Sequence, residues 1–305
     1  MLGEFFYWIF NMSIVASFTG LLVLLVRRIQ AIPHRISIFL WVVPFIRMCI
    51  PLGLNSPYSL MSLLSHFTTK TITVYQPTDN IAFSMTNSIR AANSYFPITY
   101  KVNILENIFE ISSLIWIVIA LAIIVILGTI YVISLYEIKN ASHLSKNVYF
   151  SDSVHGPAVY GIIKPKIVLP SLYEGKDNIQ YVLRHETVHI HRADNLWRLF
   201  AFFAAALHWF NPLAWVFLKR FLSDIELACD ESAIAIYNKE ERKKYAQALL
   251  HCAQSKNLFP SSFGGSKIKT RIENILSYKK LTSISAVSFT ILIILIIYVL
   301  ATNAA

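Results

Sequence analysis

Charged side chains are scarce in this sequence. Asp, Glu, Lys and Arg make up 14 % of its 305 residues, whereas hydrophobic residues make up 55 %. An ordinary soluble domain has about a quarter of its residues charged, so this composition excludes one. Cysteine is also scarce, and three residues, Cys49, Cys229 and Cys252, provide no disulfide framework. The sequence therefore indicates a membrane protein rather than a small secreted domain.

Four hydrophobic runs are long enough to cross a bilayer, which takes about 20 apolar residues in a helix. They cover residues 5–26, 36–54, 111–136 and 281–300, and the second run contains one charge, Arg47. The first run is not a signal peptide by its pattern, because Glu4 precedes it and Arg27 and Arg28 follow it where a cleavage site needs small residues. We therefore predict four transmembrane helices.

The placement of Lys and Arg predicts which side of the membrane each segment faces, because cytoplasmic segments carry an excess of them. Residues 137–280 hold 20 Lys and Arg against 13 Asp and Glu, whereas residues 55–110 hold three of each sign. We therefore expect both termini outside the cell and residues 137–280 in the cytoplasm. The net charge of +10 then reflects topology, and no nucleic-acid-binding motif frames the basic residues.

These features divide the chain into five segments. Two transmembrane helices with a short basic cytoplasmic loop (1–54) precede an extracytoplasmic loop (55–110) and a third transmembrane helix (111–136). A cytoplasmic domain (137–280) and a fourth transmembrane helix with a short outside tail (281–305) complete the chain. The predicted fold class is α+β, a polytopic helical membrane protein with one mixed cytoplasmic domain.

Residues 185–189 read His-Glu-Thr-Val-His, an HExxH motif. Positions four apart share one face of a helix, so His185 and His189 can bind one zinc ion. Glu186 is placed to act as the general base of a zinc hydrolase. Apolar residues recur around the motif at helical spacing, as a buried active-site helix needs: Ile179, Val182, Leu183 and Val188. We therefore predict a zinc-dependent hydrolase.

A catalytic zinc site keeps three protein ligands and one open position, so a third ligand is expected. Glu226 is the preferred candidate, and Asp230, four residues later on the same helix face, can orient a ligand histidine. His191 competes, although it points off the metal face. Cys229 is the other alternative, although burial as a small apolar residue is its simpler interpretation. Asp194 can either begin the next helix or support the second motif histidine.

The apolar stretch 199–218 has the length of a further span, but a single crossing would separate Glu226 from the two histidines. A helical hairpin broken at Asn211 and Pro212, with arms of about 22 Å, returns Glu226 to the level of the motif. We therefore predict a hairpin that is either buried in protein or dips into the bilayer from the inside.

The rest of the cytoplasmic domain also has readable local patterns. Short strands are predicted at 148–150, 158–163 and 166–169, and a solvated helix at 239–252. Residues 255–269 are rich in Ser, Gly and Lys, which is typical of a flexible linker. This linker is tethered close to the active site, so we predict slow self-cleavage there, around Ser262, Phe263 and Gly264.

Taken together, these motifs resemble the BlaR/MecR-type bacterial membrane metallopeptidases. The resemblance rests on residues 157–161 and 164–170, the motif 185–189 with Asp194, residues 209–213 and residues 226–230, in that order. It implies a gluzincin fold with His185, His189 and Glu226 on zinc and Glu186 catalytic. It also implies that activity relieves a paired transcriptional repressor, by cleaving it or by triggering its loss.

The resemblance has one departure. The antibiotic-sensing members carry a large penicillin-binding domain after the last span, whereas only residues 301–305 follow it here. We therefore expect a form without that sensor domain, in which the loop 55–110 or a separate protein receives the signal.

The expected reaction is peptide-bond hydrolysis, with Glu186 taking a proton and passing it to the leaving amine. A substrate strand can pair with an edge of the 158–169 hairpin, and Arg192, Arg198 or a tyrosine can stabilise the oxyanion. Expected partners are a protein substrate, the lipid bilayer and a second copy of the chain. The alternatives are a membrane quality-control protease of the HtpX/Ste24 kind and a catalytically idle receptor or scaffold.

Overall fold

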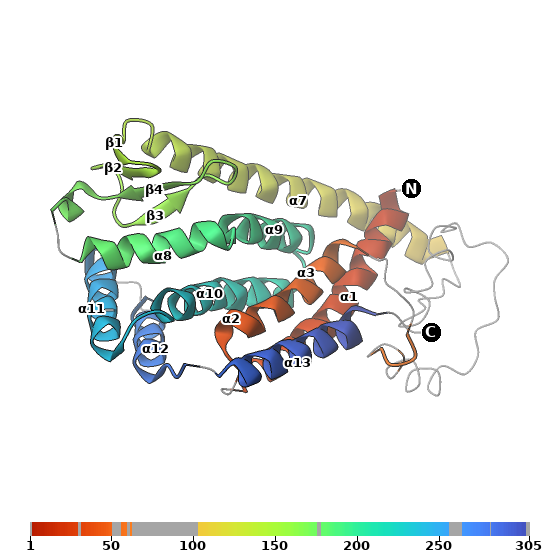
Figure 1. Cartoon of the computed structure of the whole chain (residues 1–305). Helices are drawn as coiled ribbons and strands as arrows, with labels where there is room; N and C mark the ends of the chain where they lie inside the picture. Colours follow the sequence, from red (N-terminus) through yellow and green to blue (C-terminus); the bar gives the residue numbers. More distant parts are fainter. Residues whose placement is uncertain are drawn as a thin grey trace.

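The computed structural model describes residues 2–29, 32–50, 56–59, 62, 103–175, 178–255, 264–280 and 282–302. Helices account for most of the described chain, and a single small sheet accompanies them. In Figure 1 the strands gather at the left end, whereas the chain termini lie at the right. The sheet and the chain termini therefore mark opposite ends of a long helical body.

Three helices of the described chain are long and apolar enough to cross a membrane: α1 (Leu2–Val26), α7 (Asn103–Glu137) and α13 (Ser283–Ala301). They match the predicted spans 5–26, 111–136 and 281–300. Large apolar side chains cover the outer faces of α7 and α13, as Val118 (65 % exposed) and Leu295 (57 % exposed) illustrate. Surfaces so rich in apolar side chains suit lipid rather than water. The chain is therefore a membrane protein, as its composition predicts.

The second predicted span, 36–54, differs from the other three. It forms α2 (His34–Ser37), a 3-10 turn at Ile38–Trp41 and α3 (Val42–Cys49), whereas residues 51–55 lie outside the described residues. The helical path from 34 to 49 is shorter than the roughly 20 residues that a crossing takes. A fourth crossing therefore stays a prediction.

Arg47, the one charge in that run, is buried at the end of α3. Its guanidinium donates hydrogen bonds to the backbone oxygens of Leu300 and Thr302 at 3.3 and 2.6 Å. These carbonyls lie at the C-terminal end of α13, where helical carbonyls lack intrahelical partners and carry partial negative charge. Arg47 therefore joins α3 to the end of α13.

The predicted hairpin is present as α9 (Asp194–Leu207) and α10 (Pro212–Ile234). The break falls at the predicted place, because Pro212 begins α10 and the Asn211 side chain accepts a hydrogen bond from the Leu213 N–H at 2.9 Å. The Asn211 amide also donates to the hydroxyls of Ser13 and Ser17 on α1, at 2.7 and 2.8 Å. The hairpin tip is therefore tied to α1 by a buried polar cluster.

The arm α10 runs alongside α1 for several turns beyond this cluster. A Cβ at Gly20 would lie 2.2 Å from the Phe217 ring, so the close approach of the two helices requires glycine there. On the other arm, the backbone oxygen of Leu207 accepts a hydrogen bond from the Trp116 indole of α7 at 2.7 Å. The hairpin therefore lies among helices that are long enough to cross a bilayer.

Two buried carboxylates hold the other end of α10 to the chain that follows α1. Asp224 accepts hydrogen bonds from the Arg27 guanidinium and from the Trp41 indole, the latter at 2.8 Å. Seven residues later, Glu231 accepts from the backbone N–H groups that begin α2, at 3.0 and 2.9 Å. At about 100° per residue, the two carboxylates lie roughly 20° apart around α10, on the same face.

The sheet has four strands in the order β1-β2-β4-β3: β1 (Ser142–Ser145), β2 (Val148–Phe150), β3 (Ala158–Tyr160) and β4 (Lys166–Leu169). β2 pairs with β4 in parallel, and β3 pairs with β4 antiparallel. The predicted strands at 148–150 and 166–169 are confirmed, and the one at 158–163 is present but ends at Tyr160, whereas β1 has no apolar alternation and escaped prediction. Buried side chains of β2 and β4 pack on Val182 of α8 (Ile179–His191).

Two predictions for the C-terminal part of the domain are wrong in part. The helix α11 (Lys239–Ser255) has a buried face rather than full solvation, with Tyr245, Ala246 and Ala248 packed in a core. The predicted linker 255–269 is not a linker throughout, because α12 (Gly264–Ser277) begins within it. Apolar packing overrides composition here, since Ile275 of α12 is buried in the same core.

Candidate metal centre

The helix α8 presents the HExxH motif to the interior. His185, Glu186 and His189 are 8, 6 and 6 % exposed. The Nε2 atoms of the two histidines lie 3.1 Å apart and so point to one spot, as i and i+4 positions on a helix allow. The sheet covers α8 on one side through Val182, and α10 and α11 pack against it as well. The motif is therefore held on a rigid, buried element.

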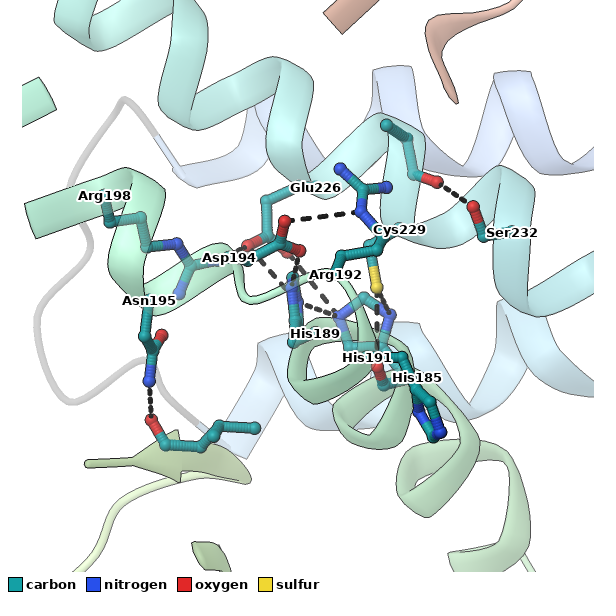
Figure 2. Close-up of polar contacts among 12 residues, drawn as sticks. His185, His189, His191, Arg192, Asp194, Asn195, Arg198, Glu226, Cys229 and Ser232 are labelled. Atoms are coloured by element: carbon teal, nitrogen blue, oxygen red, sulfur yellow. Dashed lines mark hydrogen bonds and ion pairs between the residues drawn. The ribbon is translucent and has the colours of Figure 1, made fainter. Parts of the chain in front are cut away.

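Glu226 reaches the same spot from α10. Its Oε2 lies 3.6 Å from His185 Nε2, and its Oε1 lies 3.7 Å from His189 Nε2. Figure 2 shows the carboxylate of Glu226 beside the ring of His189. Donor atoms about 2.0–2.2 Å from a tetrahedral zinc ion lie roughly 3.3–3.6 Å from one another. The three donors are therefore close to the spacing and have the chemistry that one zinc ion needs.

Cys229 also lies beside these histidines. It is fully buried, and with His185 and His189 it forms a group whose ligand atoms lie within 4.8 Å of one another. Its Sγ, however, lies 3.5 Å from His185 Nδ1, the ring nitrogen opposite the one that faces Glu226. We therefore prefer Glu226 as the third donor and assign Cys229 to the packing behind His185.

His191 is exposed, and its Nδ1 lies 2.8 Å from the backbone oxygen of Thr187. Its ring therefore bonds to its own helix rather than to the histidine pair. This agrees with the expectation that a residue two positions after His189 points off the metal face.

Asp194 supports His189 from behind. Its Oδ2 lies 2.6 Å from His189 Nδ1, which leaves Nε2 free to face Glu226. The turn that allows this contact passes through Ala193, whose φ of 52° is unusual for a residue other than glycine. Burial works against protonation of His189, but the hydrogen bond to Asp194 and the contact with Cys229 together outweigh it and raise the pKa of His189 to about 9.

His185 has a corresponding support from Asp230 and Tyr245. The Tyr245 hydroxyl lies 2.8 Å from His185 Nδ1 and donates to Asp230 Oδ1 at 2.8 Å, while Asp230 Oδ1 is itself 3.3 Å from that nitrogen. Asp230 lies six residues after Asp224, which places it about 120° away around α10. The carboxylates that face the histidines and those that hold the chain after α1 therefore lie on different sides of α10.

Two arginines contact the acidic residues of the site. Arg271 of α12 donates to both oxygens of Asp230 at 2.7 and 2.8 Å, and its Nη1 lies 3.2 Å from Glu226 Oε2. Arg198 donates to Glu226 Oε1 at 2.6 Å. Burial alone would raise the pKa values of these carboxyls, but Arg271 holds the pKa of Glu226 well below its ordinary value and lowers that of Asp230 to about 2.

Sequence reasoning missed Arg271 and Tyr245, and it named Arg198 only as an oxyanion candidate. The sequence does contain a signal for α12, because Ile268, Ile272 and Ile275 recur at helical spacing in a segment otherwise rich in Ser, Gly and Lys. The other oxyanion candidate, Arg192, lies outside the cavity and instead pairs with Asp194 at 3.3 Å.

A cavity of about 210 Å³ opens over the motif. Glu186 lines it together with both histidines, Glu226, Arg198 and Arg271, and Pro157 borders it together with Ala158 and Val159 of β3. Of the three residues predicted for self-cleavage, Ser262 and Phe263 lie outside the described residues and Gly264 begins α12. That prediction therefore stays a prediction.

Comparisons with known proteins point to one family. The sequence profile of the BlaR1 peptidase M56 family matches residues 7–275. The regulatory protein BlaR1 of Bacillus licheniformis is 29 % identical over 157 residues, or 47 % of this chain and 26 % of that protein. The methicillin resistance protein MecR1 of Staphylococcus aureus is 26 % identical over 141 residues, which are 43 % of this chain and 24 % of that protein. BlaR1 of Staphylococcus aureus is 24 % identical over 199 residues, which are 56 % of this chain and 34 % of that protein. The matches thus span about a quarter to a third of the relatives' lengths.

Proposed function

The chain belongs to the BlaR1 peptidase M56 family, and we propose that it is a membrane-bound zinc endopeptidase that transmits a signal by regulated proteolysis. The substrate we propose is a paired transcriptional repressor, by the resemblance to the BlaR/MecR-type proteins, with the chain itself as a second substrate. The observation that carries the proposal is the convergence of three donors, His185, His189 and Glu226, beside the buried carboxylate of Glu186.

In this proposal zinc is held by His185, His189 and Glu226, and when bound it acts as a Lewis acid that polarises a carbonyl and lowers the pKa of water. Glu186 lines the cavity and is not needed as a donor, so it is available to accept a proton from water and deliver it to the leaving amine. Arg198 and Arg271 lie at the cavity wall, where their charge can stabilise an oxyanion.

An extended peptide fits beside β3. In the described part of the chain, β3 has β4 as its sole strand neighbour, so β3 is the edge strand on the cavity side. The Asn195 amide already donates to the backbone oxygens of Val159 and Gly161 at 3.0 and 3.2 Å. A substrate strand therefore has to displace Asn195 or pair N-terminally of it, along Pro157 and Ala158.

We further propose four crossings, with both termini outside the cell and the zinc domain in the cytoplasm. Arg27, at the end of α1, pairs with Asp224 near the site, and α7 ends where the sheet begins. The chain between α1 and α7 must therefore pass to the far side. We propose that the run 36–54 makes this crossing, since the helix that leads into it begins at His34, which contacts Glu231 of α10, and the run carries Arg47, which meets the end of α13.

The proposed activity is tested with the full chain purified in detergent, using a repressor encoded beside it and casein as alternative substrates. Wild type should hold one zinc per chain and cut the repressor. Glu186→Gln should keep zinc and lose cleavage by roughly 10²–10⁴-fold, because it removes only the base. Glu226→Ala should lose zinc. Equal cleavage of casein and repressor would favour a quality-control protease, and full zinc in Glu226→Ala would refute the ligand set.

A further inference from the structure

A second cavity, about 370 Å³ in volume, lies between the α2–α3 segment, α9 and α10. It is separate from the peptidase cavity, since no residue lines both. Its apolar walls come mainly from aromatic and branched side chains: Phe39, Trp41, Phe45, Trp197, Phe221 and Ile225. Phe39 and Trp197 are 56 and 37 % exposed, so the cavity is continuous with the outer surface of the helices. The proteolytic reaction makes no use of this cavity.

Three charged side chains line the same cavity, namely Arg35, Arg192 and Asp194. Asp194 is already neutralised by the pair with Arg192 at 3.3 Å and bonded to His189 at 2.6 Å. The guanidinium of Arg35 has no hydrogen bond or ion pair to any residue that the structure describes. A largely apolar cavity with a surplus cation and a second guanidinium is complementary to an amphiphile with an anionic head.

The position of the cavity decides which amphiphile can reach it. Arg35 belongs to the chain just after α1, where Arg27 pairs with Asp224 at the end of a membrane-length helix. Trp197, which is 37 % exposed, stands in the cavity wall, and tryptophan is enriched where bilayer meets water. A phospholipid in that leaflet would have its phosphate at the level of Arg35 and its acyl chains beside α3 and α9.

We propose that this cavity binds one anionic phospholipid, with an acyl chain against the aromatic walls and the phosphate at Arg35 and Arg192. The bound phosphate replaces water around Arg35 and shares Arg192 with Asp194. Because Asp194 also orients His189, the lipid lies one side chain away from the proposed zinc donors. The site concerns binding alone and does not depend on the proposed proteolytic activity.

The test is native mass spectrometry of the full chain, purified in mild detergent and titrated with phosphatidylglycerol. Wild type should retain one lipid per chain, and Arg35→Gln should weaken binding roughly tenfold, as loss of a charge-assisted contact does. Arg28→Gln is the matched control, because it removes the same charge from an exposed side chain of the same loop that does not line the cavity.

A second pair of variants tests the apolar part. Val42→Trp should fill the cavity and abolish binding, whereas Ile46→Trp, one turn away and outside the cavity wall, should bind as wild type does. Equal weakening in Arg28→Gln and Arg35→Gln, or an unaffected Val42→Trp, would overturn the proposal. So would competition by glycerol phosphate at the affinity of the lipid, because the ligand would then be a free phosphate. If Val42→Trp does not fold, the comparison of Arg35→Gln with Arg28→Gln and the competition with glycerol phosphate still test the proposal.

Discussion

Arg271 should be essential to the stability of the site although it is neither a zinc donor nor the base. Its guanidinium makes two hydrogen bonds to Asp230, a carboxylate only 2 % exposed. Removing one partner of a buried ion pair costs about 3–5 kcal/mol, because it leaves the other charge uncompensated. The Tyr245 hydroxyl still donates to Asp230. We therefore expect Arg271→Gln to cost about 3 kcal/mol, the lower end of that range.

With an unfolding entropy of about 2.1 cal/mol/K per residue, that loss corresponds to a fall in melting temperature of roughly 5 °C for a chain of 305 residues. The assay is thermal unfolding of the detergent-purified protein, with zinc measured in parallel. Zinc should stay bound in Arg271→Gln, since Glu226 loses a competing cation and no donor is removed.

Lys269→Gln is the control for the Arg271 experiment. Lys269 is on the same helix and pairs with Glu273 at 3.8 Å, but both side chains are mostly exposed, so the variant should change stability by at most about 0.5 kcal/mol. In the double variant Arg271→Gln with Asp230→Asn, part of the lost stability should return, because no uncompensated charge is left. A melting temperature for Arg271→Gln within 1 °C of wild type, a shift of less than about 1 kcal/mol in a chain of this size, would refute the reasoning.

Asp194→Asn should weaken zinc binding roughly 10–100-fold without removing a donor, as measured by competition with a chromogenic chelator; unchanged affinity would show that Asp194 merely begins α9. Cys229→Ala should keep one zinc per chain, and loss of zinc would return Cys229 to the ligand set. A topology reporter fused after Ala305 should be found outside the cytoplasm, and one inserted at Lys256 should be found in the cytoplasm. A C-terminus in the cytoplasm would contradict four crossings. Wild type expressed alone should show a slow cut between about residues 256 and 271 that Glu186→Ala lacks, and a fragment common to both would be the work of host proteases.

The parts of the site that sequence predicts are those set by local geometry. The HExxH residues share one turn of one helix, so their convergence follows from spacing alone. Glu226 is predictable because the Asn211-Pro212 break reverses the chain, and the structure brings its carboxylate to 3.6 Å from His185. Both inferences use no more than helix periodicity and a capping signal.

The parts that sequence does not predict depend on contacts between distant segments. Arg47 is a lone charge in an apolar run, and its partners are backbone oxygens about 250 positions later, at the end of α13. Tyr245 lies on a helix whose composition is that of a solvated one, yet it reaches His185 across the core. Arg271 follows a Ser- and Gly-rich stretch that hides the helical spacing of its isoleucines. Composition describes the average of a segment, whereas each of these roles depends on a single side chain.

The two sides of α10 place a constraint on its length. Asp224 and Glu231 hold the chain after α1, while Glu226 and Asp230 face the histidines from the other side of the same helix. One residue inserted between Asp224 and Glu226 would rotate Asp224 by about 100° relative to Glu226, Asp230 and Glu231. Either the membrane anchor or the metal donor would then be misplaced. The spacing of these acidic residues along α10 therefore matters to the site as much as their chemical identity does.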